Sequence, residues 1–471
     1  MIDGLRPYPE MKSTGVQWLG DVPAHWDVRR IKTLLKEIDH RTKSGEERLL
    51  SLRMRRGLVD HHDSGGKPIP PDALVGFKVI EPGQIVMNRM RAAYGLFGLA
   101  DVCGLVSPDY AVFQPADNSY NRYLLETFKL PSLAAVFRAE SKGLGTGESG
   151  FLRLYTDRFG PIPVSYPPLD EQRLIVRFLD WHGAQTAKLV RAKKKIIALL
   201  NEQKQAIIHR AVTCGLDPNP KLKPSGIPWL GDVPEGWEVK RLKQVSRIRY
   251  GLGQPPAEKV GGLPLIRATN VDHGRILAKH LVYVDPDAVP KSRGAFLKTG
   301  EIIVVRSGAY TADSAIIPAD YEGSVAGYDI VVTATRVLPE FLAAVLLAPH
   351  VQIDQLIPAS MRAAQPHLNA EELGAAVLAV PDAQSQRRIV AHIDNETAIA
   401  SKAIDIAQRE IALIQEFRTR LIADVVTGKL DVCAAAASLP EVTEIEPADD
   451  LAEVDDLDEV PNDAENEEVA A

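Results

Sequence analysis

The chain has 471 residues, of which 45% are hydrophobic and 25% charged, so it has an ordinary soluble composition and room for two or three domains. Its longest apolar runs, such as Phe341 to Leu347, are too short to cross a bilayer, and no charged-then-apolar leader follows Met1. The three cysteines lie far apart and form no C-x-x-C pair. These features exclude a disulfide framework and a membrane protein, and they predict a cytoplasmic location.

The net charge of −7 is divided unevenly along the chain. The segment from Asp431 to Ala471 holds 15 acidic residues and no Lys or Arg, which leaves 47 acidic against 55 basic residues and a net charge of +8 up to Leu430. A mildly basic body is compatible with a polyanionic partner and equally with a solvated surface. Because the end of the chain combines prolines and acids without aromatics, residues 438–471 are predicted to be a disordered acidic tail.

A long internal repeat organises the chain. Lys12 to Lys36 and Lys223 to Arg247 align without gaps, with 12 of 25 positions identical and a shared core W-L-G-D-V-P-x-x-W. A second pair of segments, Pro168 to Asp217 and Pro381 to Asp431, matches at an offset of 214 residues. A repeat of this length is a duplicated domain.

The repeat predicts five regions. Each of two modules precedes a helical region, and the acidic tail follows the second. The boundaries are residues 12–168 for the first module, 169–217 for the first helical region, 223–380 for the second module, 381–431 for the second helical region and 438–471 for the tail.

The modules themselves have strand patterns. Glu81 to Arg89 and Thr299 to Arg306 each begin with a turn, continue as a short apolar strand and end in arginine. Leu49 to Arg53 and Leu265 to Thr269 form a second matching pair. Numerous short strands with Gly and Pro turns predict a mixed α+β globule in each module.

The two helical regions share one apolar stripe. Apolar residues recur at spacings of 3, 4 and 7, with charged residues on the opposite face, and we expect the two stripes to bury each other as a coiled-coil pair. Lys204 and Arg418 interrupt the stripes at matching positions, and Gly183 is expected to separate the long helix, Ala184 to Val212, from a shorter one that starts near Asp170. The alternative is two unrelated core helices. The predicted helix-pairing residues are Val190, Ile197, Leu200, Ile207, Ile404, Ile411, Ile414 and Leu421.

Four features together resemble the specificity subunits of Type I restriction-modification systems. They are the W-L-G-D-V-P-x-x-W openings, the strands ending in arginine, the P-P-L-D-E-Q-R start at Pro167 and the T-G-K-L-D end at Thr427. Residues Gln365 to Asn369 (Q-P-H-L-N) also fit the family pattern, whereas Gly143 to Gly150 departs from it. The resemblance covers roughly Lys12 to Val432 and leaves out the acidic tail.

The resemblance implies both a fold and a function. The fold is α+β: two tandem mixed α/β target recognition domains, each followed by a long helix, with the helices paired as an antiparallel coiled coil of pseudo-two-fold symmetry. Each domain would read half of a split target in double-stranded DNA. The helices would set the gap between the halves and dock two methyltransferase subunits, to which restriction/translocase subunits are added. This chain would bind no cofactor and catalyse nothing, because S-adenosylmethionine belongs to the methyltransferase.

Candidate DNA contacts follow from the residue types that read base edges, which are Arg for guanine and Asn or Gln for adenine. The repeated strand-end arginines, Arg89 and Arg306, are the first choice, with a structural ion pair as the alternative. The full predicted set is Arg53, Arg55, Asn88, Arg89, Arg91, Tyr94, Arg267, Asn270, Arg306, Ser307 and Tyr310. The repeated tryptophans are expected to anchor the start of each module in its core or against a partner subunit rather than to stack on bases.

Catalytic sites are not evident in the sequence. No nucleotide-binding P-loop and no N-P-P-Y or D-P-P-Y segment occurs, and His61, His62 and Asp63 are better explained as a polar turn than as metal ligands. Two other functions stay open: a methyltransferase or nuclease with an unrecognised site, and a coiled-coil scaffold that does not read DNA.

Overall fold

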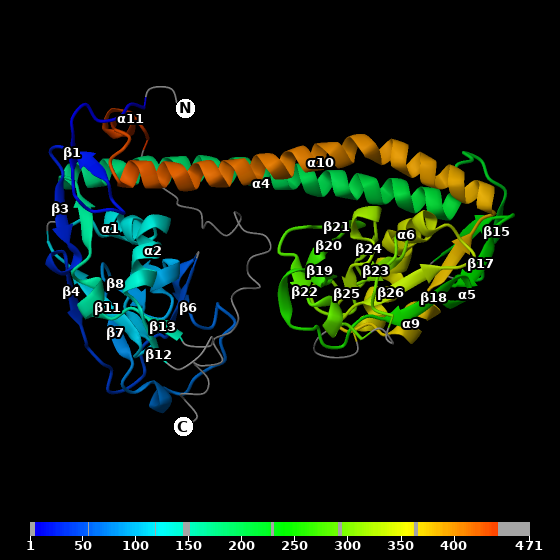
Figure 1. Cartoon of the computed structure of the whole chain (residues 1–471), viewed down its shortest axis with the longest axis horizontal. Coiled ribbons are helices and arrows are strands. Elements are labelled where there is room, and N and C mark those ends of the chain that lie inside the picture. Colours follow the sequence, from blue (N-terminus) through cyan, green and yellow to red (C-terminus); the bar gives the residue numbers. More distant parts are fainter. Residues whose placement is uncertain are drawn as a thin grey trace. The chain divides into compact units, whose positions relative to one another are not determined.

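The computed structural model describes residues 5–54, 56–117, 119–144, 151–227, 230–290, 294–361 and 366–440. The chain forms two compact units, one of residues 1–194 with 408–471 and the other of residues 195–407. Each unit combines one module with the adjoining parts of two long helices, α4 (Leu169–Cys214) and α10 (Ala383–Val426), as Figure 1 shows.

The first module is built on a four-stranded antiparallel sheet. Its strands, in spatial order, are β4 (Leu35–Ile38), β11 (Tyr110–Pro115), β8 (Ile85–Asn88) and β9 (Phe97–Leu99). Side chains alternate between two cores, since Ile85 and Met87 join one cluster while Val86 joins another. The larger cluster includes helices α1 (Asn121–Phe128) and α2 (Pro131–Glu140), where Phe97 and Phe128 pack with ring centroids 5.3 Å apart. Both faces of this sheet are therefore buried.

The second module repeats this sheet. Its strands are β18 (Ser246–Tyr250), β26 (Ile330–Ala334), β23 (Ile302–Val304) and β24 (Ser314–Ile316), in the order that matches the first module. Ile302 and Val304 lie in the cluster that includes α6 (Pro339–Leu347), whereas Ile303 faces a separate cluster. The same strand order and the same alternation show that the sequence repeat is a duplicated domain.

Smaller elements complete each module. In the first they are β1 (Met11–Ser13), β2 (Asp21–Pro23), β3 (Asp27–Arg30), β5 (Leu50–Arg53), β6 (Gly57–Asp60), β7 (Lys78–Ile80), β10 (Gly104–Val106), β12 (Lys142–Leu144), β13 (Phe151–Arg153), α3 (Thr156–Phe159) and β14 (Pro163–Tyr166). In the second they are β15 (Leu222–Pro224), β16 (Asp232–Pro234), β17 (Glu238–Arg241), α5 (Leu242–Val245), β19 (Glu258–Ile266), β20 (Val271–Asp272), β21 (Arg275–Ile276), β22 (Val282–Val284), β25 (Val325–Ala326), α7 (Pro349–Val351), α8 (Ile357–Ser360), α9 (Ala370–Ala375) and β27 (Val377–Val380).

Three of the repeated tryptophans, Trp18, Trp26 and Trp237, pack in or against the module cores, as predicted. Trp26 is fully buried, and its Nε1 donates a 2.6 Å hydrogen bond to Oε2 of Glu171, at the start of α4. Trp237 is buried in the corresponding cluster of the second unit. The W-L-G-D-V-P-x-x-W motif therefore joins the beginning of each module to a helix-bearing core, while Trp229 lies outside the described residues.

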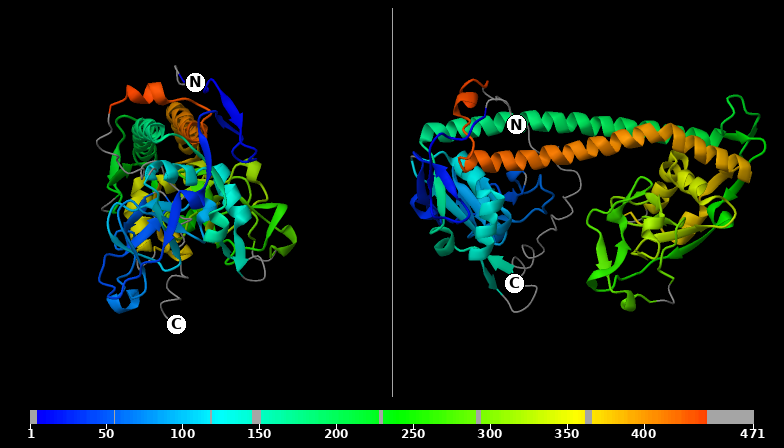
Figure 2. Two further views of the ribbon diagram at one scale, coloured as in Figure 1. Left: turned by 90° about the vertical axis from the view of Figure 1, so that its left-hand side faces the viewer. Right: turned by 45° about the horizontal axis from the view of Figure 1, so that its top comes forward.

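The two long helices are in contact and run antiparallel. In the first unit Lys193 Nζ lies 2.7 Å from Glu410 Oε2, and a Cβ built on Gly183 would lie 3.9 Å from Arg418. In the second unit Ala211 and Val212 share a core with Ile389 and Ile393. The two helices lie side by side in both views of Figure 2. All eight predicted pairing residues are buried or half-buried.

The predicted break at Gly183 is wrong, because α4 continues without interruption from Leu169 to Cys214. A glycine inside a helix costs only about 1 kcal/mol relative to alanine, and the flanking turns make up that loss by packing. The predicted α+β fold with a long helix after each module is confirmed.

The end of the chain is described only through Pro440. Helix α11 (Cys433–Ala437) packs Ala436 into the first core, and Leu439 packs against it, so the first residues assigned to the tail belong to the folded unit. The prediction for the remaining acidic residues lies outside the described residues.

Within the described part, no single helix is long and apolar enough to cross a membrane. The bent helix pair of Pro339–Leu347 and Pro349–Ser360 has the length and composition of a membrane span. Its residues Leu342 and Leu356, however, are buried in a core of the second unit.

Candidate DNA interface

The predicted contact residues lie mainly where the central strands of each sheet end. In the first module the segment after β8 leads into the short helix η3 (Ala92–Tyr94). In the second module Arg306 follows β23, and Arg267 precedes the short helix η4 (Ala268–Asn270). Strand ends and the loops after them are positions where a rigid sheet can hold side chains for recognition.

Arg89, at the end of β8, forms the structural ion pair that was the alternative to a DNA contact. Its Nη2 lies 2.6 Å from Glu37 Oε1 on β4, and Thr156 donates a 2.5 Å hydrogen bond to the other Glu37 oxygen. The Arg89 side chain is only 20% exposed. In this structure its charge is therefore neutralised within the module.

The two predicted asparagines close turns. Asn88 is 4% exposed, and its Oδ1 accepts hydrogen bonds from the backbone N–H groups of Met90 and Arg91. Asn270 is fully buried, and its amide donates to the backbone carbonyls of Leu277 and Lys279. Either amide group would reach a base edge only if its hydrogen bonds to the backbone of the turn were broken.

The other predicted residues of the first module have mixed surroundings. Tyr94 is 62% exposed, and the Arg138 guanidinium lies 5.2 Å from its ring centroid. Arg91 is half-buried, and Arg53 donates a 3.3 Å hydrogen bond to the Ser64 carbonyl. Arg55 lies outside the described residues.

Arg306 has different partners from its first-module counterpart. Its guanidinium carbon lies 4.7 Å from the ring centroid of Tyr250 and 4.4 Å from that of Tyr328, and its Nη2 lies 2.7 Å from His367 Nε2. We call these four residues the Arg306 cluster. The two tyrosines are 42% and 44% exposed, so the cluster lies at the surface. Among the described residues, no carboxylate forms an ion pair with the Arg306 guanidinium.

The neighbouring candidate residues in the second module already have partners within that module. Arg267 donates from Nη2 to the His280 carbonyl at 2.9 Å. Ser307 pairs through its backbone with His367, and Tyr310 packs against a core cluster. Among the described residues, no aromatic ring stacks on the Arg267 guanidinium as two do on that of Arg306.

A buried carboxylate supports the same strand end. Asp329 is 3% exposed, and its Oδ1 accepts a 3.2 Å hydrogen bond from the backbone N–H of Arg306. Burial raises the pKa of this carboxyl to about 6, although the hydrogen bond and charge of Arg306 act in the opposite direction. The folded module therefore favours the neutral form of Asp329 more than the unfolded chain does.

This raised pKa predicts a pH-dependent effect of Asp329→Asn. Stability held by the neutral acid is fully present only below pH 3.8, the ordinary pKa of this carboxyl, and is lost as the pH rises from there through about 6. The unfolding free energy of the variant, relative to the parent, should therefore increase by about 2 kcal/mol between pH 4 and pH 8. Urea unfolding at several pH values measures this difference in unfolding free energy. A hydrogen bond lost in the variant changes the difference by the same amount at every pH, so only its pH dependence tests the assignment. A difference that does not change with pH would contradict the assignment.

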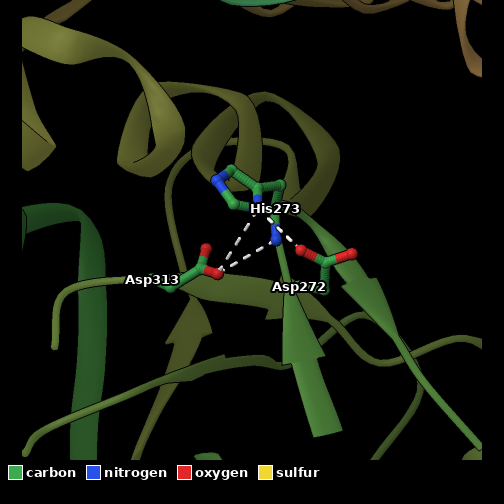
Figure 3. A group of neighbouring side chains, drawn as sticks. All are labelled: Asp272, His273 and Asp313. Carbon is green, nitrogen blue, oxygen red and sulfur yellow. Dashed lines mark hydrogen bonds and ion pairs between the residues drawn. The ribbon is translucent and has the colours of Figure 1, made fainter. Parts of the chain in front are cut away.

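A second polar group joins the second module to both helices within its unit. Figure 3 shows Asp272, His273 and Asp313, whose possible ligand atoms lie within 4.8 Å of one another. His273 Nδ1 lies 2.7 Å from Asp272, and the His273 backbone N–H donates to Asp313 at 3.0 Å. The hydrogen bond to Asp272 raises the pKa of His273, which favours the imidazolium form.

Cations from the surrounding elements balance these carboxylates. Arg275 Nη1 lies 2.5 Å from Asp405 on α10, and Lys204 on α4 interacts electrostatically with Asp272. Burial lowers the pKa of Lys204. A carboxylate pair with a histidine could suit a divalent cation, but here each charge already faces an opposite charge. The arrangement is best explained as an ion-pair network, and it explains why a lysine interrupts the helical stripe.

His61 takes part in ordinary hydrogen bonds. Its ring nitrogens lie 2.8 Å from Ser51 Oγ and 3.2 Å from the Lys67 carbonyl oxygen, which fits the predicted polar turn.

Sequence reasoning missed Tyr250 and His367 as members of the Arg306 cluster. The Q-P-H-L-N segment was the available signal for His367, but nothing in the sequence places it beside residue 306.

Known proteins are similar to this chain in sequence. It is 28% identical to the Type I restriction enzyme MjaVIII specificity subunit of Methanocaldococcus jannaschii over 39% of this chain and 40% of that protein. It is 23% identical to the EcoBI specificity subunit of Escherichia coli over 56% of this chain and 57% of that protein. The matched segments thus span about half the length of these relatives.

A solved structure and a family model agree with these likenesses. A chain from a structural study of complex assembly and conformational transition of the type I R-M system superposes with a TM-score of 0.55 at 14% identity, covering 86% of this chain and 98% of that one. This likeness shows the fold. The family model described as Type I restriction modification DNA specificity domain matches residues 76–199 and 234–412, more than half of the chain. The chain belongs to the Type I restriction modification DNA specificity family.

Proposed function

We propose that this chain is the non-catalytic subunit that gives a Type I restriction-modification complex its DNA sequence specificity. The observation that carries the proposal is the duplication of one recognition fold, with a long helix after each copy, in a chain of this family. Two readers in one chain suit a target with two different halves, because each module has its own strand-end loops.

The helices serve as the spacer between the two readers. The spacing between half-sites on DNA depends on the distance between the elements that read them. A long antiparallel pair of helices resists bending, since each helix satisfies its own backbone and buries its stripe against the other. The length of α4 and α10 then sets the number of unread base pairs.

The helices also offer a second apolar surface, which we propose as the docking site of two methyltransferase subunits. These residues, which we call the outer row, remain substantially exposed although the pairing residues beside them are buried or half-buried. They are Leu189, Ile196 and Leu199 on α4, and Ile399, Ile406, Leu413 and Phe417 on α10. Several are seven residues apart, the spacing that a partner helix would need. Exposed apolar residues in such a row are typical of protein interfaces.

The methyltransferase supplies S-adenosylmethionine and the methylation of adenine, and restriction/translocase subunits join the same complex. In this assignment the present chain contributes DNA contacts from its strand-end loops. Apart from Arg89, whose guanidinium is paired with Glu37, the residues predicted from the sequence remain proposals, and the exposed Tyr94 and the Arg306 cluster are the ones whose surroundings favour contact most.

Methylation measured with and without the partner tests this function. Cells that express the chain together with its methyltransferase should methylate adenines in one split motif with two unlike halves and a fixed gap. The purified chain alone should transfer no methyl group from S-adenosylmethionine to DNA. Methylation by the chain alone would identify it as an enzyme, and an assembled complex without any motif would identify it as a scaffold.

A further inference from the structure

The two modules differ at one matched position. Arg89 and Arg306 both follow the same central strand, and each lies six residues after an equivalent glycine, Gly83 or Gly300. Arg89 is paired with Glu37 at 2.6 Å, whereas Arg306 forms no ion pair with a carboxylate among the described residues. The same residue in the same fold thus has a neutralised charge in one module and an available charge in the other.

The Arg306 cluster fixes the orientation of its guanidinium. The Tyr250 hydroxyl accepts a 2.8 Å hydrogen bond from the backbone N–H of Ala370, and the backbone N–H of Leu368 donates to the Arg306 carbonyl at 2.7 Å. The tyrosine rings contact the faces of the guanidinium, so its N–H groups remain directed along its edge. His367 uses one N–H of Nη2, and within the described residues Nη1 has no hydrogen-bond partner.

We propose that Arg306 reads a guanine in the half-site of the second module, and that Arg89 reads no base. Two parallel N–H groups on a fixed guanidinium match the O6 and N7 acceptors of guanine in the major groove. This inference rests on the proposed function, and it adds the chemical identity of one base in the target and the residue that selects it.

The alternative partner of such an arginine is a DNA phosphate. A phosphate contact needs charge but little orientation, and it is independent of sequence, so both modules of a duplicated fold would gain from keeping it. The structure instead has an immobilised arginine in one module and an internally paired arginine in the other. A difference between modules is what the reading of two unlike half-sites requires.

The test uses the complete complex with its methyltransferase and the split motif of the parent protein. Arg306→Lys keeps the charge but loses the paired donors, and Arg306→Gln offers the donor and acceptor that suit adenine. Both variants should lose roughly 5- to 150-fold in preference for guanine at one position of the second half-site, and the glutamine variant should gain adenine there. Arg89→Lys is the matched control, and it should leave every base preference in the first half-site unchanged.

A measurement on the parent protein removes any dependence on the folding of the variants. Replacing each guanine of the second half-site in turn by 7-deazaguanine, which lacks the N7 acceptor, should weaken binding several-fold at one position. Arg306→Lys should be insensitive to that same replacement, since the contact is already lost.

Three results would overturn the inference. The second half-site could contain no guanine that responds to 7-deazaguanine. Arg306→Gln, which removes the charge, could instead weaken binding evenly across sequences and reduce the slope of log affinity against log salt by about one, which identifies a phosphate contact. Arg306→Lys could also leave binding unchanged. If the parent complex itself has no split motif, the proposed function fails together with this inference, whereas the three results above leave that function intact.

Discussion

Insertion of one helical turn into both α4 and α10 is expected to lengthen the gap between the two half-sites by roughly one to two base pairs and to leave both half-site sequences unchanged. One turn adds about 5 Å along a helix, while successive base pairs are about 3.4 Å apart. Matching insertions after Lys194 and after Ala407 extend both partners of the antiparallel pair at the boundary between the two units. The measurement is the sequence of the methylated motif.

A loop insertion is the control for this experiment. A four-residue insertion, about one helical turn in length, is placed instead after Asn219, an exposed position between α4 and β15. It lengthens the chain without lengthening the helices. That variant should keep the parent gap. An unchanged gap in the helix variant, in a complex that still assembles and methylates DNA, would show that the helices do not set the spacing.

A charged residue substituted into the outer row of one helix is expected to prevent one of the two methyltransferase subunits from binding. Leu199 is 55% exposed and Leu413 is 63% exposed, and the two residues occupy equivalent positions in the sequence repeat. Leu199→Glu and Leu413→Glu should each reduce the complex from two methyltransferase copies to one, and the double variant should bind none. Burying an unpaired carboxylate in an apolar interface typically weakens binding by about 30-fold or more. Native mass measurement of the assembled complex gives the stoichiometry.

These substitutions should not unfold the chain, because exposed helix positions typically change stability by about 0.5 kcal/mol or less. Ala198→Glu and Ala412→Glu are the matched controls, since they add the same charge at exposed neighbouring positions outside the outer row. Both controls should keep two copies. Full assembly of the double variant would place the methyltransferase elsewhere on this chain.

The duplicated fold could be predicted from sequence because its signals are local and repeated. The W-L-G-D-V-P-x-x-W motif occurs twice, and the apolar stripe has matching members in both helices, such as Ile197 and Ile411. The prediction failed at Gly183, where a single residue with a weak helix propensity was outweighed by packing over the whole length of α4.

The contact residues could be predicted only in part, because a sequence does not show which polar side chain at a strand end finds a partner. Asn88 and Asn270 have the chemistry to read adenine but close turns instead. Arg89 and Arg306 look equivalent in sequence, yet Glu37 neutralises only the first. The Arg306 cluster joins residues from four separate segments, and nothing local in the sequence brings its two tyrosines and its histidine together.

The assignment of one half-site to each module is tested most directly by sequencing the methylated adenines after one module has been replaced. Residues 223–380 are exchanged for the second module of another specificity subunit, with both helices kept, and the variant is expressed with the parent methyltransferase. One half of the split motif and the gap are expected to stay the same, while the other half changes. A change in both halves, or in neither, would contradict the assignment of one half-site to each module.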